Sequence, residues 1–283
     1  MRTPPRLLPL LEDGLIDEVV CQLMSGKEAQ VYVVRCGDEM RCAKVFKEAN
    51  QRSFKQAVQY QEGRSGRNSR RNRAMSKKSR YGQKEQESAW LNAEVDALRQ
   101  LAAAGVRVPQ PYSFVDGVLL MELVSDADGN AAPRLGDLNH TPAEAHELHG
   151  RILGEIVRML CAGLVHGDLS PFNILVGPQG PVIIDLPQAV DAARNNNAAM
   201  MLERDVDNMR QWFGQFAPEL LDTAYGKEIW ALYQSGDLQP DSALSGVVAE
   251  DDTVTDLREL LAVIEDAKQE EAARLEREQA EAE

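Results

Sequence analysis

Three polar side chains in one part of the chain have the types and the spacing of a phosphate-transfer site. Asp168 and Asn173 lie in the sequence HGDLSPFNIL, and Asp185 ends the sequence PVIID. Transfer of a phosphoryl group requires a positioned acceptor hydroxyl and Mg²⁺ to neutralise the phosphate charge. Asp168 is suited to orient or deprotonate that hydroxyl, and the side-chain oxygens of Asn173 and Asp185 are suited to bind Mg²⁺.

The residues between Asn173 and Asp185 predict a β-hairpin. Two short apolar runs, 173–176 and 181–184, are separated by the turn signal GPQG. Such a hairpin returns the chain on itself and places Asp185 beside Asn173. The alternative is that these residues are only turn residues and a strand-end cap, for which Asp and Asn are common. The combination of the two sequences favours the phosphate-transfer site.

Short apolar runs near the N-terminus predict three antiparallel strands. They cover Val19 to Met24, Ala29 to Cys36 and Met40 to Phe46. The first turn, SGKEA at 25–29, has small residues whose backbone N–H groups could approach phosphates. It does not match the G-x-x-x-x-G-K-[ST] phosphate loop, and by itself an ordinary hairpin turn explains it better.

Lys44 lies at the centre of the third predicted strand, among apolar residues. A buried ammonium group requires a counter-charge, whereas an outward-facing lysine does not. A helix predicted from about Lys84 to Ala104 carries Glu94 beside its apolar stripe and ends at Gly105. Glu94 would be solvated on an exposed face, or would form with Lys44 an ion pair that organises a phosphate site. The order of strand lysine and helix glutamate favours the ion pair.

The middle of the chain predicts two further strands and the connection between two lobes. The strands are expected at Pro109 to Phe114 and at Val118 to Val124, on either side of an Asp-Gly turn. The end of the second strand, from Met121 onward, would connect the lobes. The backbone of Glu122 and Leu123 could then hydrogen-bond the edge of an adenine ring.

The second half of the chain predicts helices. The longest runs from Thr141 to Ala162, with Thr141 as N-cap, proline next and Glu144 completing a capping box. His146 and His149 share this helix, but two histidines offer too few ligands for zinc, so we expect surface or packing residues. Further helices are expected at 200–216 and 218–233.

Charge is distributed unevenly along the chain. The 283 residues carry a formal charge of -14, and 43% of them are hydrophobic, which fits one two-lobed domain with extensions. A negative chain argues against general nucleic-acid affinity, yet segment 51–84 contains eleven Lys and Arg and one acid. A solvated loop is the more frequent explanation of such a basic segment. The acidic end, Thr253 to Glu283, is predicted to be a solvated helix or a disordered tail.

The cysteines and the apolar segments bear on the cellular compartment of the protein. Four cysteines without a C-x-x-C pair lie in apolar surroundings, which predicts buried free thiols in a reducing environment. The N-terminal apolar patch is interrupted by Pro9 and lacks a small-residue cleavage site. No apolar run reaches the roughly 18 residues that a membrane helix needs. We therefore expect a cytoplasmic protein.

Taken together, these motifs resemble the RIO family of atypical serine/threonine protein kinases, closest to its type-1 branch. The resemblance covers roughly Val19 to Gln239 and rests on the SGKEA turn, the HGDLS-x-FN loop and the sequence IIDLPQ at 183–188. The GxGxxG, HRD, DFG and APE motifs of ordinary protein kinases are absent. Pro171 is a departure, because type-1 members more often have an acid there.

The resemblance implies an α+β, bilobal protein-kinase-like fold, with a small antiparallel-sheet N-lobe that has one main helix and a mostly helical C-lobe. The expected parts are an extension at 1–17, the N-lobe at 18–122 with a basic flexible loop at about 51–84, the C-lobe at 123–240 and an acidic helical or disordered tail at 241–283. The implied cofactors are ATP and Mg²⁺, with Mn²⁺ as an alternative metal. The implied roles are Asp168 as the catalytic aspartate, Asn173 and Asp185 as metal ligands, Ser25, Gly26, Lys27 and Glu28 over the triphosphate, Lys44 and Glu94 as the ion pair, and Met121, Glu122 and Leu123 as the hinge.

Three functions follow as hypotheses. The first is a serine/threonine protein kinase that transfers the γ-phosphate of ATP to protein hydroxyls, including its own. The second is an ATPase switch that acts in ribosome assembly or binds RNA, because members of the family are linked to ribosome maturation and the 51–84 loop is basic. The third is a small-molecule phosphotransferase of the aminoglycoside kinase kind, against which the SGKEA turn and the IDLPQ sequence argue.

Overall fold

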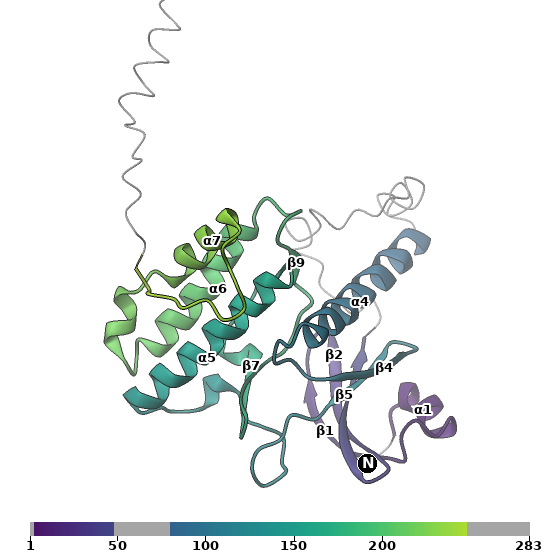
Figure 1. Ribbon diagram of the computed structural model, residues 1–283. Helices are drawn as coiled ribbons and strands as arrows, with labels where there is room; N and C mark the ends of the chain where they lie inside the picture. The colour runs from purple at the N-terminus through teal and green to yellow at the C-terminus, as the bar shows by residue number, and fades with distance from the viewer. Residues whose placement is uncertain (1–2, 48–79, 248–283) are drawn as a thin grey trace, which may run out of the picture. The chain divides into compact units, whose positions relative to one another are not determined.

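The computed structural model describes residues 3–47 and 80–247, and all elements discussed below lie within the unit Met1–Gly246. Figure 1 shows helices α5, α6 and α7 grouped together and the labelled strands of a sheet grouped beside α4. In the described part of the chain, no helix has both the length and the apolar character needed to cross a bilayer. The predicted acidic helix at 253–283 and most of the predicted basic loop lie outside the described residues.

The first half of the chain forms a five-stranded antiparallel sheet in the order β1-β2-β3-β5-β4. All five strands were predicted, and their bounds differ from the predicted ones by no more than two residues. Lys44 lies in the central strand, where it pairs with Val31 on one side and Leu119 on the other. The strands are β1 (Glu18–Ser25), β2 (Ala29–Cys36), β3 (Glu39–Phe46), β4 (Pro111–Val115) and β5 (Val118–Glu122).

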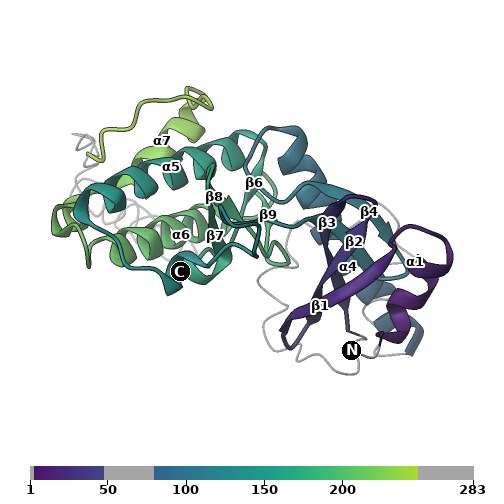
Figure 2. The same cartoon turned by 90° about the horizontal axis from the view of Figure 1, so that it is seen from below.

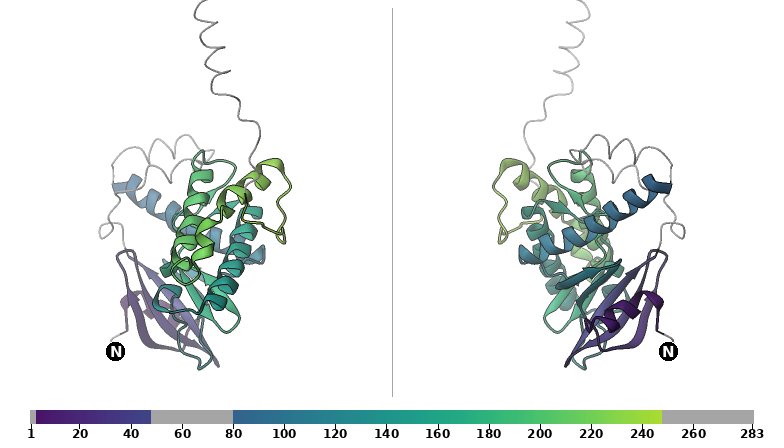
Figure 3. Two further views of the ribbon diagram at one scale, coloured as in Figure 1. Left: turned by 90° about the vertical axis from the view of Figure 1, so that its left-hand side faces the viewer. Right: turned by 90° about the vertical axis from the view of Figure 1, so that its right-hand side faces the viewer.

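The two faces of this sheet have different partners, because successive side chains of a strand point to opposite faces. One face is covered by the N-terminal segment, in which η1 (Pro5–Leu7) leads into α1 (Leu8–Glu12). Figure 3 shows this purple helix lying against the sheet. The other face carries Lys44. The cluster on the covered face contains Leu7, Leu10, Ile16, Tyr32, Val34, Ala43, Val45, Val118 and Leu120.

Helix α4 (Arg80–Ala103) belongs to the same half of the molecule. Its buried positions include Val95, Leu98 and Leu101, which join the main core, and Gly105 ends it with a positive φ of 78° as predicted. The helix begins four residues earlier than expected. Residues 80–84 are therefore helical and not part of a loop, which corrects the predicted boundary of the basic segment.

The second half is mostly helical. Helix α5 (Pro142–Cys161) has the predicted capping box, in which Thr141 and Glu144 exchange hydrogen bonds. Helix α6 (Ala198–Phe213) follows, and then η5 (Pro218–Asp222) and α7 (Tyr225–Ser235). The helix predicted from 218 to 233 is thus interrupted. The N–H of Ala224 bonds the carbonyl of Gly246, at 2.7 Å, instead of continuing a helix.

Two small two-stranded sheets lie between the five-stranded sheet and the large helices in Figure 2. The predicted hairpin before Asp185 is confirmed as β7 (Ile174–Gly177) paired with β8 (Gly180–Ile183). The 3-10 turn η4 (Pro171–Asn173) directly precedes β7, and η3 (Leu135–Asp137) lies earlier in the chain, before α5. A second two-stranded sheet pairs β6 (Leu164–Val165) with β9 (Val190–Asp191), on either side of the hairpin in sequence. Together they fix both ends of the loop that contains Asp168.

The cysteines agree only in part with the sequence prediction. All four are free thiols, as expected, and Cys42 is buried. Cys21 and Cys161 are exposed, so the prediction that the thiols are buried is wrong for these two. Cys21 lies on β1, an edge strand with a neighbour on one side only, and Cys161 is the last residue of α5.

His146 and His149 occupy different surroundings, as expected for surface and packing residues. His146 is exposed and pairs with Glu219. His149 is 2% exposed and packs between the rings of Phe213 and Tyr225, with centroids 5.4 and 5.7 Å away. Its Nε2 has no hydrogen-bond partner among the described residues. Burial, with a smaller contribution from His146, lowers the pKa of His149 from 6.5 to about 4.

We expect His149 to make the fold sensitive to acid. Between pH 6.5 and pH 4 the unfolded chain binds a proton at this site and the folded chain does not, so the free energy of unfolding falls as the pH is lowered. The full effect of this shift is about 3 kcal/mol. Urea unfolding of the wild type and of His149→Leu at pH 7 and pH 4.5 measures it. The variant should lose less stability on acidification than wild type and a His146→Gln control; parallel losses would contradict the assignment.

Candidate active site

The predicted ion pair is present. Lys44 on β3 donates to Oε1 of Glu94 on α4, at 2.5 Å, and to Oδ1 of Asp185, at 3.1 Å. The side chains of Lys44 and Glu94 are 13% and 5% exposed. One ammonium group therefore joins the sheet, the main helix of the first half and the end of the β7–β8 hairpin.

The charges of this triad depend on one another. Burial by itself lowers the pKa of Lys44, but the two carboxylates outweigh it and the net shift is upward, so the lysine is charged at neutral pH. The positive charge of Lys44 holds the pKa of Asp185 below its usual value. Burial raises the pKa of Glu94, and Lys44 opposes this shift. The charge of Lys44 thus favours the ionised form of both carboxylates.

Asp185 leaves β8 in an unusual backbone conformation. Its φ is 66°, in the left-handed region that few residues other than glycine adopt. The N–H of the preceding Ile184 donates to the carbonyl of Asn173, at 2.9 Å. The hairpin therefore brings Asp185 next to the Asn173 backbone, as predicted, and the turn directs its carboxylate toward Lys44.

The loop with Asp168 is held through its backbone. The amide of Asn173 donates to the carbonyl of Asp168, at 2.9 Å, which leaves the amide oxygen of Asn173 for another partner. His166, 3% exposed, accepts from the N–H of Asp168 through Nδ1 and contacts the carbonyl of Ile184 through Nε2, at 3.1 Å. The carboxylate of Asp168 itself is exposed.

Asp205 is a site-forming residue that the sequence reasoning missed. It lies on α6, is 1% exposed, and accepts from the N–H groups of Gly167 and Leu169, at 2.7 and 2.9 Å. Burial raises the pKa of Asp205, while the nearby His166, these two hydrogen bonds and Arg204 act in the opposite direction. On the same helix Asn208 donates to the carbonyl of Leu169 at 2.8 Å. The sequence contained one indication of this role: Asp205 is an acid on the apolar face of the helix predicted at 200–216.

The SGKEA turn connects β1 and β2. Ser25 still pairs with Gln30, and the N–H of Gly26 donates to the carbonyl of Ala29, at 2.9 Å. Lys47, at the end of β3, donates to the carbonyl of Gly26 at 2.6 Å. The turn is therefore tied to the strand that carries Lys44. Lys27 and Glu28 lie at the tip of the turn. Contact with the triphosphate stays a prediction for all four residues, Ser25, Gly26, Lys27 and Glu28.

The predicted hinge is partly engaged by the protein itself. The N–H of Glu122 donates to the carbonyl of Gln110, at 2.8 Å, so this donor is engaged within the protein, and contact of the Glu122 backbone with adenine stays a prediction. The carboxylate of Glu122 binds Arg107 in a bidentate pair, at 2.6 and 2.8 Å. Met121 lines a small cavity of about 30 Å³ together with Lys44 and Asp185. Leu123 accepts from the Ser125 hydroxyl through its carbonyl, at 3.2 Å.

The donor set at this site fits Mg²⁺. Asn173 and Asp185 offer an amide and a carboxylate oxygen, which are the hard ligands that Mg²⁺ prefers over nitrogen or sulfur. Two protein ligands are also the usual number for Mg²⁺ bound with a nucleotide. Within the described ranges, no three His, Cys, Asp or Glu residues gather as a separate metal cluster.

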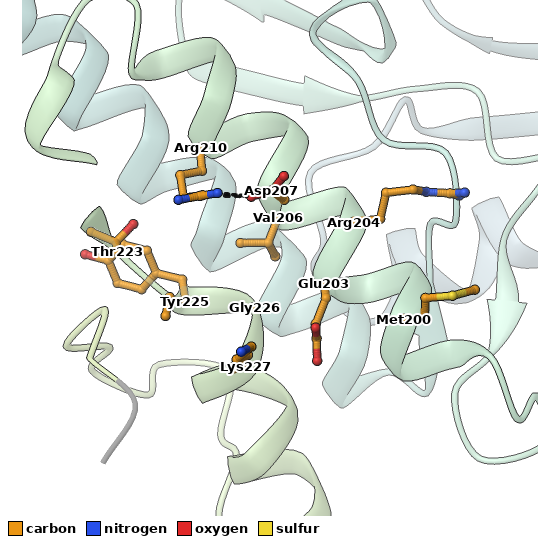
Figure 4. A pocket seen from close by; sticks show the side chains of 11 residues that line it. Met200, Glu203, Arg204, Val206, Asp207, Arg210, Thr223, Tyr225, Gly226 and Lys227 are labelled. Atoms are coloured by element: carbon orange, nitrogen blue, oxygen red, sulfur yellow. Dashed lines mark hydrogen bonds and ion pairs between the residues drawn. The ribbon is translucent and has the colours of Figure 1, made fainter. Parts of the chain in front are cut away.

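A larger cavity of about 510 Å³ lies away from these residues, between α6 and the start of α7. Figure 4 shows Asp207 and Arg210 paired across one side of it, and Glu203 and Lys227 near one another on the two helices. None of the predicted site residues lines it, and its mixture of acids and bases indicates no single ligand class.

These features define the class of the molecule. A lysine of the central strand bound to a helix glutamate, facing an HGD loop and a hairpin aspartate, is the arrangement of a protein-kinase-like fold. A solved structure agrees: the Rio2 kinase–ADP/Mg²⁺–phosphoaspartate complex from Chaetomium thermophilum has a TM-score of 0.56 over 94% of this chain and 75% of that chain, at 20% identity. The predicted fold class is confirmed. Residues 30–225 match the RIO domain, and the chain belongs to the RIO family.

Relatives with Rio1 names agree with the type-1 resemblance. The RIO-type serine/threonine-protein kinase Rio1 of Haloferax volcanii is 34% identical over 205 residues, covering 72% of this chain and 66% of the relative. The serine/threonine-protein kinase RIO1 of Homo sapiens is 30% identical over 218 residues, covering 75% and 36%. The chain thus spans just under two thirds of the first relative and little more than a third of the human one.

Proposed function

We propose that this chain is an ATP- and Mg²⁺-dependent serine/threonine protein kinase of the RIO type, which transfers the γ-phosphate of ATP to protein hydroxyls, its own included. The observation that carries this proposal is the position of Lys44, which binds Glu94 and Asp185 at once on the side of the sheet that faces the Asp168 loop. Family membership and the names of the relatives support it.

Each side chain has a role that its surroundings permit. Lys44, held charged by Glu94, would bind the α- and β-phosphates. Asp168, exposed beside the loop backbone, would accept or orient the acceptor hydroxyl. Asn173 and Asp185 would hold Mg²⁺, which supplies charge neutralisation to the phosphates when it is bound. Asp205 keeps the loop rigid through two backbone N–H groups, so that Asp168 and Asn173 keep a constant separation.

The partners and the compartment remain proposals. The acceptor protein is unassigned, and self-phosphorylation is the simplest case. Contact of RNA or a ribosomal subunit with the basic segment stays a prediction, since 51–79 lies outside the described residues. A cytoplasmic location stays a prediction as well. Membership of the RIO family argues against the small-molecule hypothesis.

Incubation with γ-labelled ATP and Mg²⁺, with and without a generic basic acceptor protein, tests the proposal. Label on protein that survives acid and hydroxylamine marks a phosphorylated serine or threonine and supports the kinase. Label that hydroxylamine removes marks an acyl phosphate, and free phosphate without stable label marks hydrolysis. Either of these two results favours the ATPase switch over the kinase.

A further inference from the structure

The backbone of Arg134 is held by hydrogen bonds at the edge of the candidate site. It forms a bridge with Leu175 on β7, and the N–H of Val176 donates to the carbonyl of its neighbour Pro133, at 2.9 Å. The carbonyl of Arg134 accepts from the N–H of Asp137, at 3.0 Å. Arg134 is therefore anchored to the same hairpin whose ends hold Asn173 and Asp185.

The side chain of Arg134 reaches from this hairpin to the sheet. Its Nη2 contacts Sδ of Met24, at 2.9 Å, although 110 positions separate the two residues. Met24 directly precedes the Ser25–Glu28 turn. A thioether is a weak acceptor and carries no charge, so this contact leaves the charge of the guanidinium uncompensated. Within residues 3–47 and 80–247, no carboxylate forms an ion pair with Arg134.

The two anchors of Arg134 place this charge at the edge of the nucleotide site. Met24 directly precedes the Ser25–Glu28 turn, and β7 directly follows Asn173. Lys44 is already matched by the carboxylates of Glu94 and Asp185. A bound triphosphate would bring several negative charges to a place where the strand lysine is neutralised, and a guanidinium binds phosphate oxygens in a fork geometry.

We propose that Arg134 is a nucleotide-phosphate ligand, which exchanges its contact with Met24 for phosphate oxygens when the nucleotide binds. This inference rests on the proposed function and adds a residue to its site. The proposal also predicts different effects on ligands with and without phosphate groups. A guanidinium that binds phosphate should contribute to affinity for ATP and ADP, and should contribute nothing to affinity for adenosine.

Binding of ATP, ADP, AMP and adenosine to the full chain, measured by calorimetry with Mg²⁺, tests the proposal. We expect Arg134→Ala to weaken ATP and ADP binding about tenfold or more, AMP binding less, and adenosine binding not at all. Arg134→Lys, which keeps the charge but not the fork, should recover part of the loss. Arg35→Ala removes a surface arginine of β2 that pairs with Glu18, at the end of the β1–β2 pair away from the Ser25–Glu28 turn, and serves as the matched control, with unchanged affinities.

Two results would overturn the inference. Equal losses for ATP and adenosine in Arg134→Ala would mean that the residue only supports the shape of the site, and unchanged ATP affinity would mean that it does not touch the phosphates. Failure of the proposed function is distinguishable from both, because the labelling experiment measures phosphate transfer separately, and a chain that only hydrolyses ATP still binds it.

Discussion

Replacement of Asp168 by alanine is expected to lower the rate of phosphate transfer by about 10²–10⁴-fold, the usual contribution of a positioned acid–base group. The side chain is exposed, and its carboxylate has no hydrogen bond or ion pair within the described residues. Folding should therefore be nearly unaffected, with a change in the free energy of unfolding within about 0.5 kcal/mol. Transfer of label from γ-labelled ATP and urea unfolding measure the two quantities on the same preparation.

A control variant shows whether the effect is specific to the carboxylate of Asp168 or follows the loss of any exposed carboxylate. Asp222→Ala removes another exposed acid, in η5 at the opposite end of the large helices, and should keep the wild-type rate. Asp168→Asn, which retains size but cannot take a proton, should resemble the alanine variant. A wild-type rate in either Asp168 variant would refute its assigned role.

Asp205→Asn is expected to destabilise the fold and to reduce transfer together. The buried carboxylate accepts from two backbone N–H groups, and an asparagine amide would direct N–H toward one of these two donors. Loss of a buried, charge-assisted hydrogen bond with an unsatisfied donor left behind costs about 3 kcal/mol. We expect that decrease in the free energy of unfolding by urea, and a fall in transfer rate because the Asp168 loop loses its anchor.

Asp207 provides the comparison on the same helix. Its carboxylate pairs with Arg210, and both side chains are at least 30% exposed. Asp207→Asn should therefore cost less than about 1 kcal/mol and leave transfer unchanged. If Asp205→Asn and Asp207→Asn lost equally little stability, the proposed anchoring of the loop would be wrong.

The strands, the hairpin and the capping box could be predicted because each depends on local signals. Apolar alternation, glycine turns and the Thr141–Glu144 spacing act within a few residues, and the structure follows them closely. The pairing of Lys44 with Glu94 spans 50 positions and is not local. It could be predicted only because a buried lysine needs a counter-charge and the order of elements matched a known family.

Other features depend on contacts that no local pattern encodes. Asp205 bonds a loop 36 and 38 positions earlier, so its role appears only when α6 packs beneath that loop. The N–H of Glu122 is taken by Gln110, a partner set by how β4 enters the sheet. The break before α7 arises from a bond to Gly246, 22 positions later. In each case a tertiary contact overrides or adds to the local preference.

The N-terminal residues that cover the sheet lie outside the segment that matches the RIO domain, but they are part of the folded structure. The RIO domain match begins at residue 30, inside β2, yet Leu7, Leu10 and Ile16 pack on buried side chains of β2, β3 and β5, and β1 forms the edge of the sheet. A protein cut at the limits of the match would expose Tyr32, Val34 and Val45 to water and leave β2 as an unprotected edge. The autonomous folding unit is therefore larger than the recognisable domain, and the strand that carries Lys44 owes its rigidity to residues outside that domain.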